Sequence, residues 1–140
     1  MFAIDNPFSI LEKEKYPLVN KFYKKFYKKG IAGKNEQVYV VQKKEIICAG
    51  KIKRLDDIYL LTGVVCNPAH QGQGYASYLI RNILLIHNKP IYCFPYSHLE
   101  KFYTQQGFVP IDTLNVPETI QHRFINYSQH KALLLMIFNP

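Results

Sequence analysis

A glycine-containing loop between an apolar strand and an apolar helix constrains this chain more than any other feature. The strand pattern ends at Asn67-Pro68, the loop contains Gly72 and Gly74, and a helical run follows from Gln73. Two glycines let several backbone N–H groups turn the same way and let a ligand approach closely. The helix start adds unpaired N–H donors and the positive end of the helix dipole. The sequence therefore predicts an anion site, of the kind that binds phosphate groups.

Two common phosphate loops do not fit. A P-loop requires a Lys-Ser or Lys-Thr pair after its second glycine, and neither Gly72 nor Gly74 is followed by one. The dinucleotide fingerprint requires three glycines and an acidic residue about twenty positions on. This chain has two glycines there, and no acid lies between Asp57 and Glu100. Both interpretations are excluded.

The loop resembles the acetyl-CoA loop of the GCN5-related N-acetyltransferase (GNAT) superfamily. That loop has the pattern Gln/Arg-x-x-Gly-x-Gly/Ala, and this chain has Gln71-Gly72-Gln73-Gly74-Tyr75-Ala76 directly after the strand. A second stretch, Phe102-Tyr103-Thr104-Gln105-Gln106-Gly107-Phe108, is similar to the Phe/Leu-Tyr-x-x-x-Gly-Phe signature that ends the next helix in the same superfamily. The interval between them suits a helix, a strand and another helix. The resemblance covers roughly residues 17–138.

Hydrophobic periodicity predicts a mixed α/β fold, and the short breaks between the three central strands favour an antiparallel meander. A helix between strands 57–66 and 91–94 makes those two strands a parallel pair. The resemblance implies a GNAT-like fold in residues 1–140, with a mostly antiparallel mixed sheet, helices on both faces and the parallel pair splayed around pantetheine. The expected strands are 2–4, 37–42, 45–54, 57–66, 91–94, 108–111 and 132–138, and the expected helices are 17–29, 73–87, 97–106 and 117–127.

The resemblance also implies the cofactor site. Acetyl-CoA would be the co-substrate, its pantetheine paired with backbone groups of the strand and its pyrophosphate held by the loop and helix start. Gln71 stands where many members carry Arg, which would weaken the charge-assisted contact. The expected cofactor-binding residues are Val64, Val65, Cys66, Gln71, Gly72, Gln73, Gly74, Tyr75, Ala76 and Ser77.

Tyr103 occupies the position of the tyrosine that often protonates the leaving thiolate in this superfamily. It is therefore the expected general acid, with packing as the alternative role. The general base stays open. Candidates by availability alone are Glu45, Asp56, Asp57 and His98, and a water chain is a further alternative.

The positive charge of the chain is unevenly distributed. The net charge is +8, and the whole excess lies in residues 1–54, because residues 55–140 contain five basic and five acidic residues. Residues 21–34 contain six lysines and no acid. This pattern favours nucleic acid, an acidic acceptor or the cofactor phosphates, and a solvated lysine-rich surface is the other interpretation. If that segment borders the acceptor, a polyamine is a poor substrate and the preferred acceptor is neutral or acidic around its amine.

Three cysteines without a Cys-x-x-Cys pair predict reduced thiols that pack as small apolar side chains, and no metal site. The sequence shows neither a secretory signal nor an apolar run long enough to span a membrane, so the expected location is the cytoplasm and no membrane partner is expected.

The expected function is transfer of an acetyl group from acetyl-CoA to a primary amine of a small molecule or peptide, by direct attack in a ternary complex. The alternatives are a non-catalytic acyl-CoA-binding domain and a small basic nucleic-acid-binding protein. Within the first interpretation, nucleic acid enters only through a tRNA-type acceptor. The chain is expected to be a monomer or a homodimer.

Overall fold

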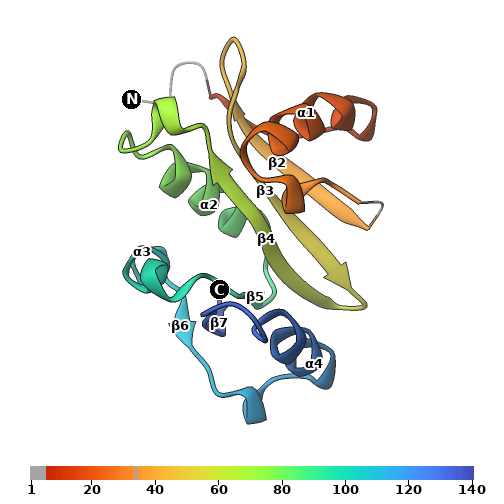
Figure 1. Cartoon of the computed structure of the whole chain (residues 1–140), viewed down its shortest axis with the longest axis vertical. Helices are drawn as coiled ribbons and strands as arrows, with labels where there is room; N and C mark the ends of the chain where they lie inside the picture. Colours follow the sequence, from red (N-terminus) through yellow and green to blue (C-terminus); the bar gives the residue numbers. More distant parts are fainter. Residues whose placement is uncertain (1–5, 34) are drawn as a thin grey trace.

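A computed structural model describes residues 6–33 and 35–140. In this part of the chain, seven strands form one sheet in the order β1-β2-β3-β4-β5-β7-β6 (Figure 1). Every pairing is antiparallel except β4 with β5, which is parallel. The strands are β1 (Phe8–Ile10), β2 (Glu36–Gln42), β3 (Ile46–Leu55), β4 (Ile58–Cys66), β5 (Ile91–Cys93), β6 (Val109–Pro110) and β7 (Met136–Phe138).

Helices cover both faces of the sheet. They are α1 (Tyr16–Phe26), α2 (Tyr75–Ile86), α3 (Glu100–Gln105) and α4 (Glu118–Tyr127). Short 3₁₀ turns connect them to the sheet: η1 (Lys13–Lys15), η2 (Lys28–Gly30), η3 (Pro68–His70), η4 (Ser97–Leu99) and η5 (Thr113–Asn115). None of the helices in the described part of the chain has the length and apolarity that a membrane crossing requires.

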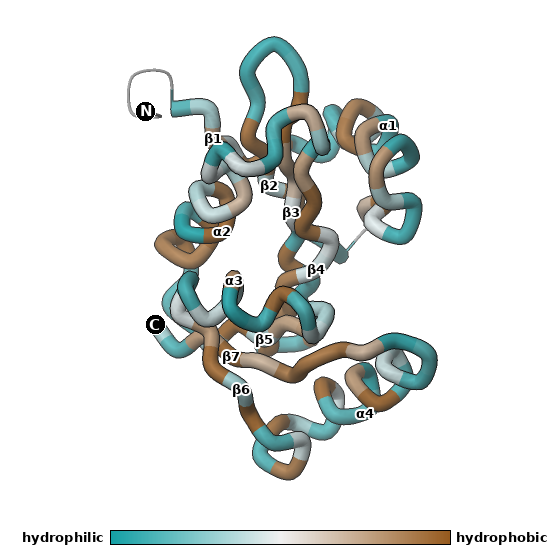
Figure 2. Tube along the Cα trace, turned by 60° about the vertical axis from the view of Figure 1, so that its left-hand side comes forward, coloured by the Kyte–Doolittle hydropathy of each residue, from teal (hydrophilic) through white to brown (hydrophobic). Residues whose placement is uncertain are grey.

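The alternation of side chains along the strands sorts the core onto the two faces. Val38 and Val40 of β2 pack with α1, whereas Tyr39 and Val41 of the same strand pack with α2. Leu60 of β4 belongs to a third cluster, with Ile120 of α4. Hence α1 and α4 share one face, and α2 and α3 share the other. Figure 2 shows hydrophobic residues along the central strands, and hydrophilic residues along one side of α1.

The predicted order of elements is confirmed from the helix after the first strand onward, and so is the single parallel pair. The first strand, β1 at Phe8–Ile10, was not predicted. The predicted strand 132–138 is too long, because residues 132–134 pair with the segment after β5 and not with β5 itself. Leu133 forms an isolated bridge with Tyr96, and the N–H of Leu134 donates to the carbonyl of Pro95 at 2.8 Å. Regular pairing with β5 therefore begins only at Met136. The predicted strand 2–4 lies outside the described residues.

The prediction that all three cysteines are reduced thiols is wrong for two of them. Cys48 of β3 and Cys66 of β4 form a disulfide, and only Cys93 is free within the described residues, where it is buried. The two cysteines are 18 residues apart in sequence and lie directly opposite in the antiparallel β3–β4 pair, with Cα atoms 4.1 Å apart. Strand register, which composition does not show, brings the two sulfurs together.

Candidate active site

The central feature of the site is a gap between β4 and β5. The two strands pair only over Tyr59, Leu60 and Leu61 of β4. β5 ends at Cys93, and Pro95 just beyond it has no N–H to donate. β4 continues for five residues, 62–66, with no β5 partner among the described residues. The backbone polar groups of β4 on this side are therefore open to a ligand.

A bulge at Gly63 bends β4 at the point where the gap begins. Gly63 has a φ of +62°, and the register between β3 and β4 shifts between Ala49 and Lys51. A Cβ at Gly63 would lie 2.8 Å from Cε of Lys51, so a side chain is excluded by space as well as by conformation. The Tyr23 hydroxyl donates to the Gly63 carbonyl at 2.9 Å and holds the bulge against α1. Such a bulge re-aims the strand that carries it.

The gap forms a pocket of about 270 Å³, here called the interstrand pocket. Its walls come from the end of α1, from β4 and from the segment between β5 and α3: Phe26, Tyr27, Leu61, Thr62, Gly63, Val64, Val65, Cys93, Phe94, Pro95, Tyr96, Leu99 and Tyr103. Val64 and Val65, both predicted cofactor contacts, line it. Cys66 does not line it, and its side chain is held in the disulfide at the end of β4.

The glycine loop follows β4 directly, and its backbone allows a ligand to approach closely. Asn67 begins it, with a side-chain oxygen that accepts from the Ala69 N–H at 3.0 Å. Gly72 and Gly74 have φ values of +80° and +84°, and a Cβ built on either would meet nothing within 4 Å. Gly74 is the N-cap of α2, and the first turn of α2 contains no acidic residue. An open, glycine-lined helix start of this kind fits a pyrophosphate group.

The two sequence motifs meet in space through Gln106. Its side-chain amide donates to the Ser77 hydroxyl in the first turn of α2 at 3.0 Å and accepts from Nε of Arg81 at 3.1 Å. It also donates to the Phe102 carbonyl at 3.3 Å. Gln106 is buried, so this contact ties the end of α3 to the start of α2. The helix that carries Tyr103 is thereby fixed relative to the glycine loop.

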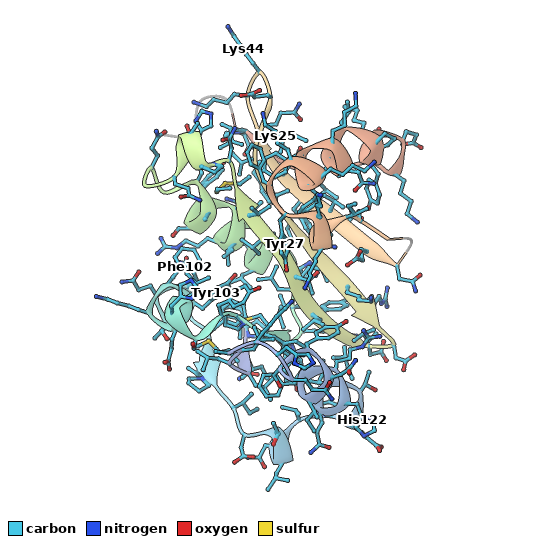
Figure 3. All side chains as sticks on the ribbon, in the orientation of Figure 1. Lys25, Tyr27, Lys44, Phe102, Tyr103 and His122 are labelled. Atoms are coloured by element: carbon cyan, nitrogen blue, oxygen red, sulfur yellow. A yellow bond between two sulfur atoms is a disulfide. The ribbon has the colours of Figure 1, made fainter. Side chains whose placement is uncertain are left out.

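A second pocket, of about 510 Å³, adjoins the first and is here called the basic pocket. Its lining residues are Tyr27, Lys29, Ile31, Glu36, Lys51, Lys53, Leu61, Thr62, Gly63, Phe94, Tyr96, Tyr127, Lys131 and Leu133. Six of them also line the interstrand pocket, namely Tyr27, Leu61, Thr62, Gly63, Phe94 and Tyr96. Figure 3 shows Tyr27 near the middle of β4. The two pockets are therefore parts of one continuous cleft that crosses the sheet at the gap.

A comparison with protein-family models matches residues 34–110 to an acetyltransferase (GNAT) domain. The matched segment covers more than half of the chain and includes the meander, the gap and both motifs. The chain belongs to the GNAT acetyltransferase family. No curated protein sequence matches significantly.

Several proteins of known structure share this fold at low sequence identity. The Rv2747 protein from Mycobacterium tuberculosis, in complex with CoA, is 14% identical with a TM-score of 0.72, over 95% of this chain and 98% of that one. Escherichia coli ElaA is 18% identical with a TM-score of 0.67, over 94% of this chain and 98% of that one. N-acetylglutamate synthase from Neisseria gonorrhoeae, complexed with coenzyme A and N-acetyl-glutamate, is 12% identical with a TM-score of 0.67. That match covers 94% of this chain but only 34% of the synthase.

Tyr103, the expected general acid, lies on α3 (Figure 3) and lines the interstrand pocket. Its ring packs edge-on against Phe102 and Phe108, with centroids 5.2 and 5.7 Å away. Burial raises the pKa of the Tyr103 hydroxyl well above its ordinary value, and the nearby Cys93 thiol raises it further. Tyr103 therefore keeps its proton at neutral pH.

The basic pocket contains a buried ion pair that the sequence did not reveal. Lys51 Nζ lies 3.1 Å from Oε2 of Glu36, and both residues are buried. Glu36 also accepts from the Gly33 N–H at 2.6 Å. Burial lowers the pKa of Lys51, and the Glu36 carboxylate opposes that shift. The Lys51 ammonium also lies over the Tyr23 ring, 5.6 Å from its centroid. These contacts hold the Lys51 side chain beside the Gly63 bulge.

None of the four candidate general bases lines either pocket. Asp56 and Asp57 lie at the turn between β3 and β4, Glu45 lies at the turn between β2 and β3, and His98 stacks on Tyr96 outside the cleft. Glu36 is the carboxylate that lines the basic pocket within the described residues. Its position one residue before the predicted strand 37–42 gave no sign of this role, because the contacts that bury it come from distant residues.

Proposed function

We propose that this GNAT protein transfers the acetyl group of acetyl-CoA to a primary amine. The main observation in support of this proposal is that a single strand, β4, passes all three parts of the site. β4 runs from the basic pocket through the gap to the glycine loop, so it connects a place for an acceptor, a slot for a thioester and a site for phosphate.

The residues present fit acetyl-CoA along this path. The backbone N–H groups around Gly72 and Gly74 and the first turn of α2 would hold the pyrophosphate, and that first turn contains no acidic side chain to oppose it. The unpaired edge of β4 at Val64 and Val65 would pair with the pantetheine amides. Gln71 offers a neutral amide where many family members offer a guanidinium, so the backbone supplies most of the attraction.

Acetyl-CoA supplies an activated acetyl group. The protein orients the two substrates and supplies a proton. The amine nitrogen bonds to the acetyl carbon while the carbon–sulfur bond breaks. Tyr103, facing the interstrand pocket, would give its proton to the departing sulfur. The amine loses a proton to water in the open cleft, and this proton restores the tyrosine. The products are the acetylated amine and free coenzyme A.

The fold of the gonococcal synthase accommodates coenzyme A and an acetylated amino acid in one complex. At 12% identity this likeness shows the fold alone, so the acceptor of the present protein must be argued from its own pocket.

The decisive experiment has two measurements. Calorimetric titration with acetyl-CoA tests the cofactor site, and thiol release over a panel of amines tests transfer. The panel includes spermidine, lysine-containing peptides and free amino acids. Binding without thiol release from any amine would favour a non-catalytic acyl-CoA-binding domain. Salt-dependent binding of RNA or DNA, unaffected by coenzyme A, would instead favour the nucleic-acid interpretation.

A further inference from the structure

The basic pocket has an excess of positive charge that its own carboxylate does not balance. Lys29, Lys53 and Lys131 line it together with Lys51. Lys51 is paired with Glu36, and no other carboxylate lines the pocket within residues 6–33 and 35–140. The salt bridges of that part of the chain involve none of the other three lysines. The pocket therefore presents three ammonium groups without an ionic partner.

Two of these lysines come from distant parts of the chain and meet at the pocket. Lys29 belongs to η2 after α1, and Lys131 follows α4. Figure 1 shows α1 and α4 on the same, right-hand side of the molecule. The contact with the Lys131 ammonium lowers the pKa of Lys29. Like charges this close repel each other, and an anion between them would remove the repulsion.

The remaining walls of the basic pocket restrict what that anion can be. Tyr27, Phe94, Tyr96 and Tyr127 give it aromatic sides, and about 510 Å³ suits a molecule of amino-acid to dipeptide size. The pocket opens into the gap where the thioester would lie, through the six residues that both pockets share. A ligand held by the lysines can therefore direct a second group toward the acetyl carbon.

We propose that the acceptor is an amino acid or short peptide with a free carboxylate, and that Lys29 and Lys131 bind that carboxylate while the amine points into the gap. This inference rests on the proposed acetyl transfer and names its substrate class. Lys53 completes the positive field from β3. The lysines act on binding and orientation, so they are specificity residues and take no part in proton transfer.

The test measures binding, which requires no turnover. CoA-saturated protein is titrated by calorimetry with the N-acetyl derivatives of glycine, leucine, glutamate and phenylalanine, each as the free acid and as the carboxamide. These compounds mimic the product of the reaction. For the preferred skeleton, the acid should bind about tenfold or more tightly than the amide, since a hydrogen bond to a charged group is worth that much. The preference should shrink as salt rises.

Variants assign the effect to the lysine pair. Lys29→Met with Lys131→Met should remove the preference of acid over amide and leave acetyl-CoA affinity unchanged. The matched control is Lys24→Met with Lys28→Met, which removes the same charge from exposed positions that line neither pocket. The control should keep the preference in full.

The outcomes separate this inference from the proposed function. Equal binding of acid and amide for all four skeletons overturns the carboxylate subsite, and so does a preference that survives in the Lys29/Lys131 variant. Thiol release from the amine panel decides the transfer reaction independently. Acid-selective binding without thiol release would keep the subsite and reject the reaction, and the opposite result would keep the reaction and reject the subsite.

Discussion

The side-chain amide of Gln106 donates a hydrogen bond to the hydroxyl of Ser77 across 3.0 Å. The two residues are 29 positions apart, one at the end of α3 and one in the first turn of α2. Gln106 belongs to the second sequence motif and Ser77 directly follows the glycine-loop motif, so this contact joins the two motifs. The helix that follows the glycine loop and the helix that carries Tyr103 are connected through a single buried amide.

We expect Gln106→Leu to loosen this connection. The variant removes the hydrogen bonds to half-buried Ser77 and exposed Arg81 and should cost about 1 kcal/mol of stability. It should also weaken acetyl-CoA binding, because α2 and α3 are no longer held together. Gln105→Leu, at the exposed neighbouring position, is the control. Denaturant unfolding and acetyl-CoA titration of both variants check this, and identical behaviour of the two would remove the structural role of Gln106.

Acetyl-CoA should raise the melting temperature of the protein, and Gly74→Asp should abolish the effect. A protein stabilised by a ligand at one hundred times its dissociation constant gains about 2.7 kcal/mol. Aspartate at Gly74 would place a carboxylate at the helix start, against the pyrophosphate. Gly74→Asn is the matched control, since asparagine tolerates the same positive φ without the charge. A melting temperature that does not respond to millimolar acetyl-CoA in the wild type would contradict the cofactor site.

Tyr103→Phe should lower the turnover of the preferred amine by roughly 10²- to 10³-fold, in the usual range for a general acid. Acetyl-CoA affinity should change little, because the ring still packs against Phe102 and Phe108. Tyr92→Phe is the control, since Tyr92 is buried on β5 but lines neither pocket. Unchanged turnover in Tyr103→Phe would leave Tyr103 with a packing role only.

Glu36→Gln should destabilise the fold strongly, because it leaves the Lys51 ammonium buried beside a neutral group. Breaking a buried ion pair on one side costs about 3–5 kcal/mol. The double variant Glu36→Gln with Lys51→Met should recover most of this loss. Asp57→Asn removes the exposed partner of Lys89 and should cost less than about 1 kcal/mol. Thermal unfolding of the three variants is the measurement, and a Glu36→Gln effect no larger than that of Asp57→Asn would contradict the buried pair.

The free energy of unfolding should fall as the pH rises above about 10. Burial raises the pKa of Tyr39 to about 12, and it raises the pKa values of Tyr23 and Tyr103 further. The folded state therefore holds protons that the unfolded state has lost. Stability from these groups is complete below their unfolded pKa near 10 and is lost as the pH passes through their folded values. Urea unfolding between pH 8 and 11.5 checks this, and a stability that stays level or rises across pH 10–11.5 would contradict it.

The local pattern of apolar residues predicted most helices and strands of this protein, because apolar residues repeat with different periods in helices and strands. Val38 to Val41 alternate between two faces, and Leu79, Ile80 and Ile83 repeat as a helix does. The glycine loop was predictable too, since its chemistry is in the backbone. The ends of elements were less predictable. β7 starts late because Leu133 pairs with Tyr96, a partner that only the folded chain supplies.

Most side-chain contacts of the cleft could not be predicted from the sequence. Lys131 sits in a C-terminal half of balanced charge, and nothing nearby in the chain connects it with Lys29. The Glu36–Lys51 pair and the Cys48–Cys66 disulfide depend on strand register, which short-range pattern does not encode. Only Gly63, an isolated glycine in a strand of apolar residues, was a visible sign of the bulge beneath the cleft.

The bulge at Gly63 also bears on how a family can change its substrates. The slot beside β4 exists because backbone pairing stops there, and it needs little from side chains beyond one glycine. Almost every surrounding residue can therefore be substituted while the slot stays in place. This agrees with a fold that is shared at 12–18% sequence identity. The basic pocket, in contrast, is made of side chains from η2, β3 and the segment after α4. Single substitutions can therefore alter the chemistry of the basic pocket while the slot beside β4 is inherited unchanged.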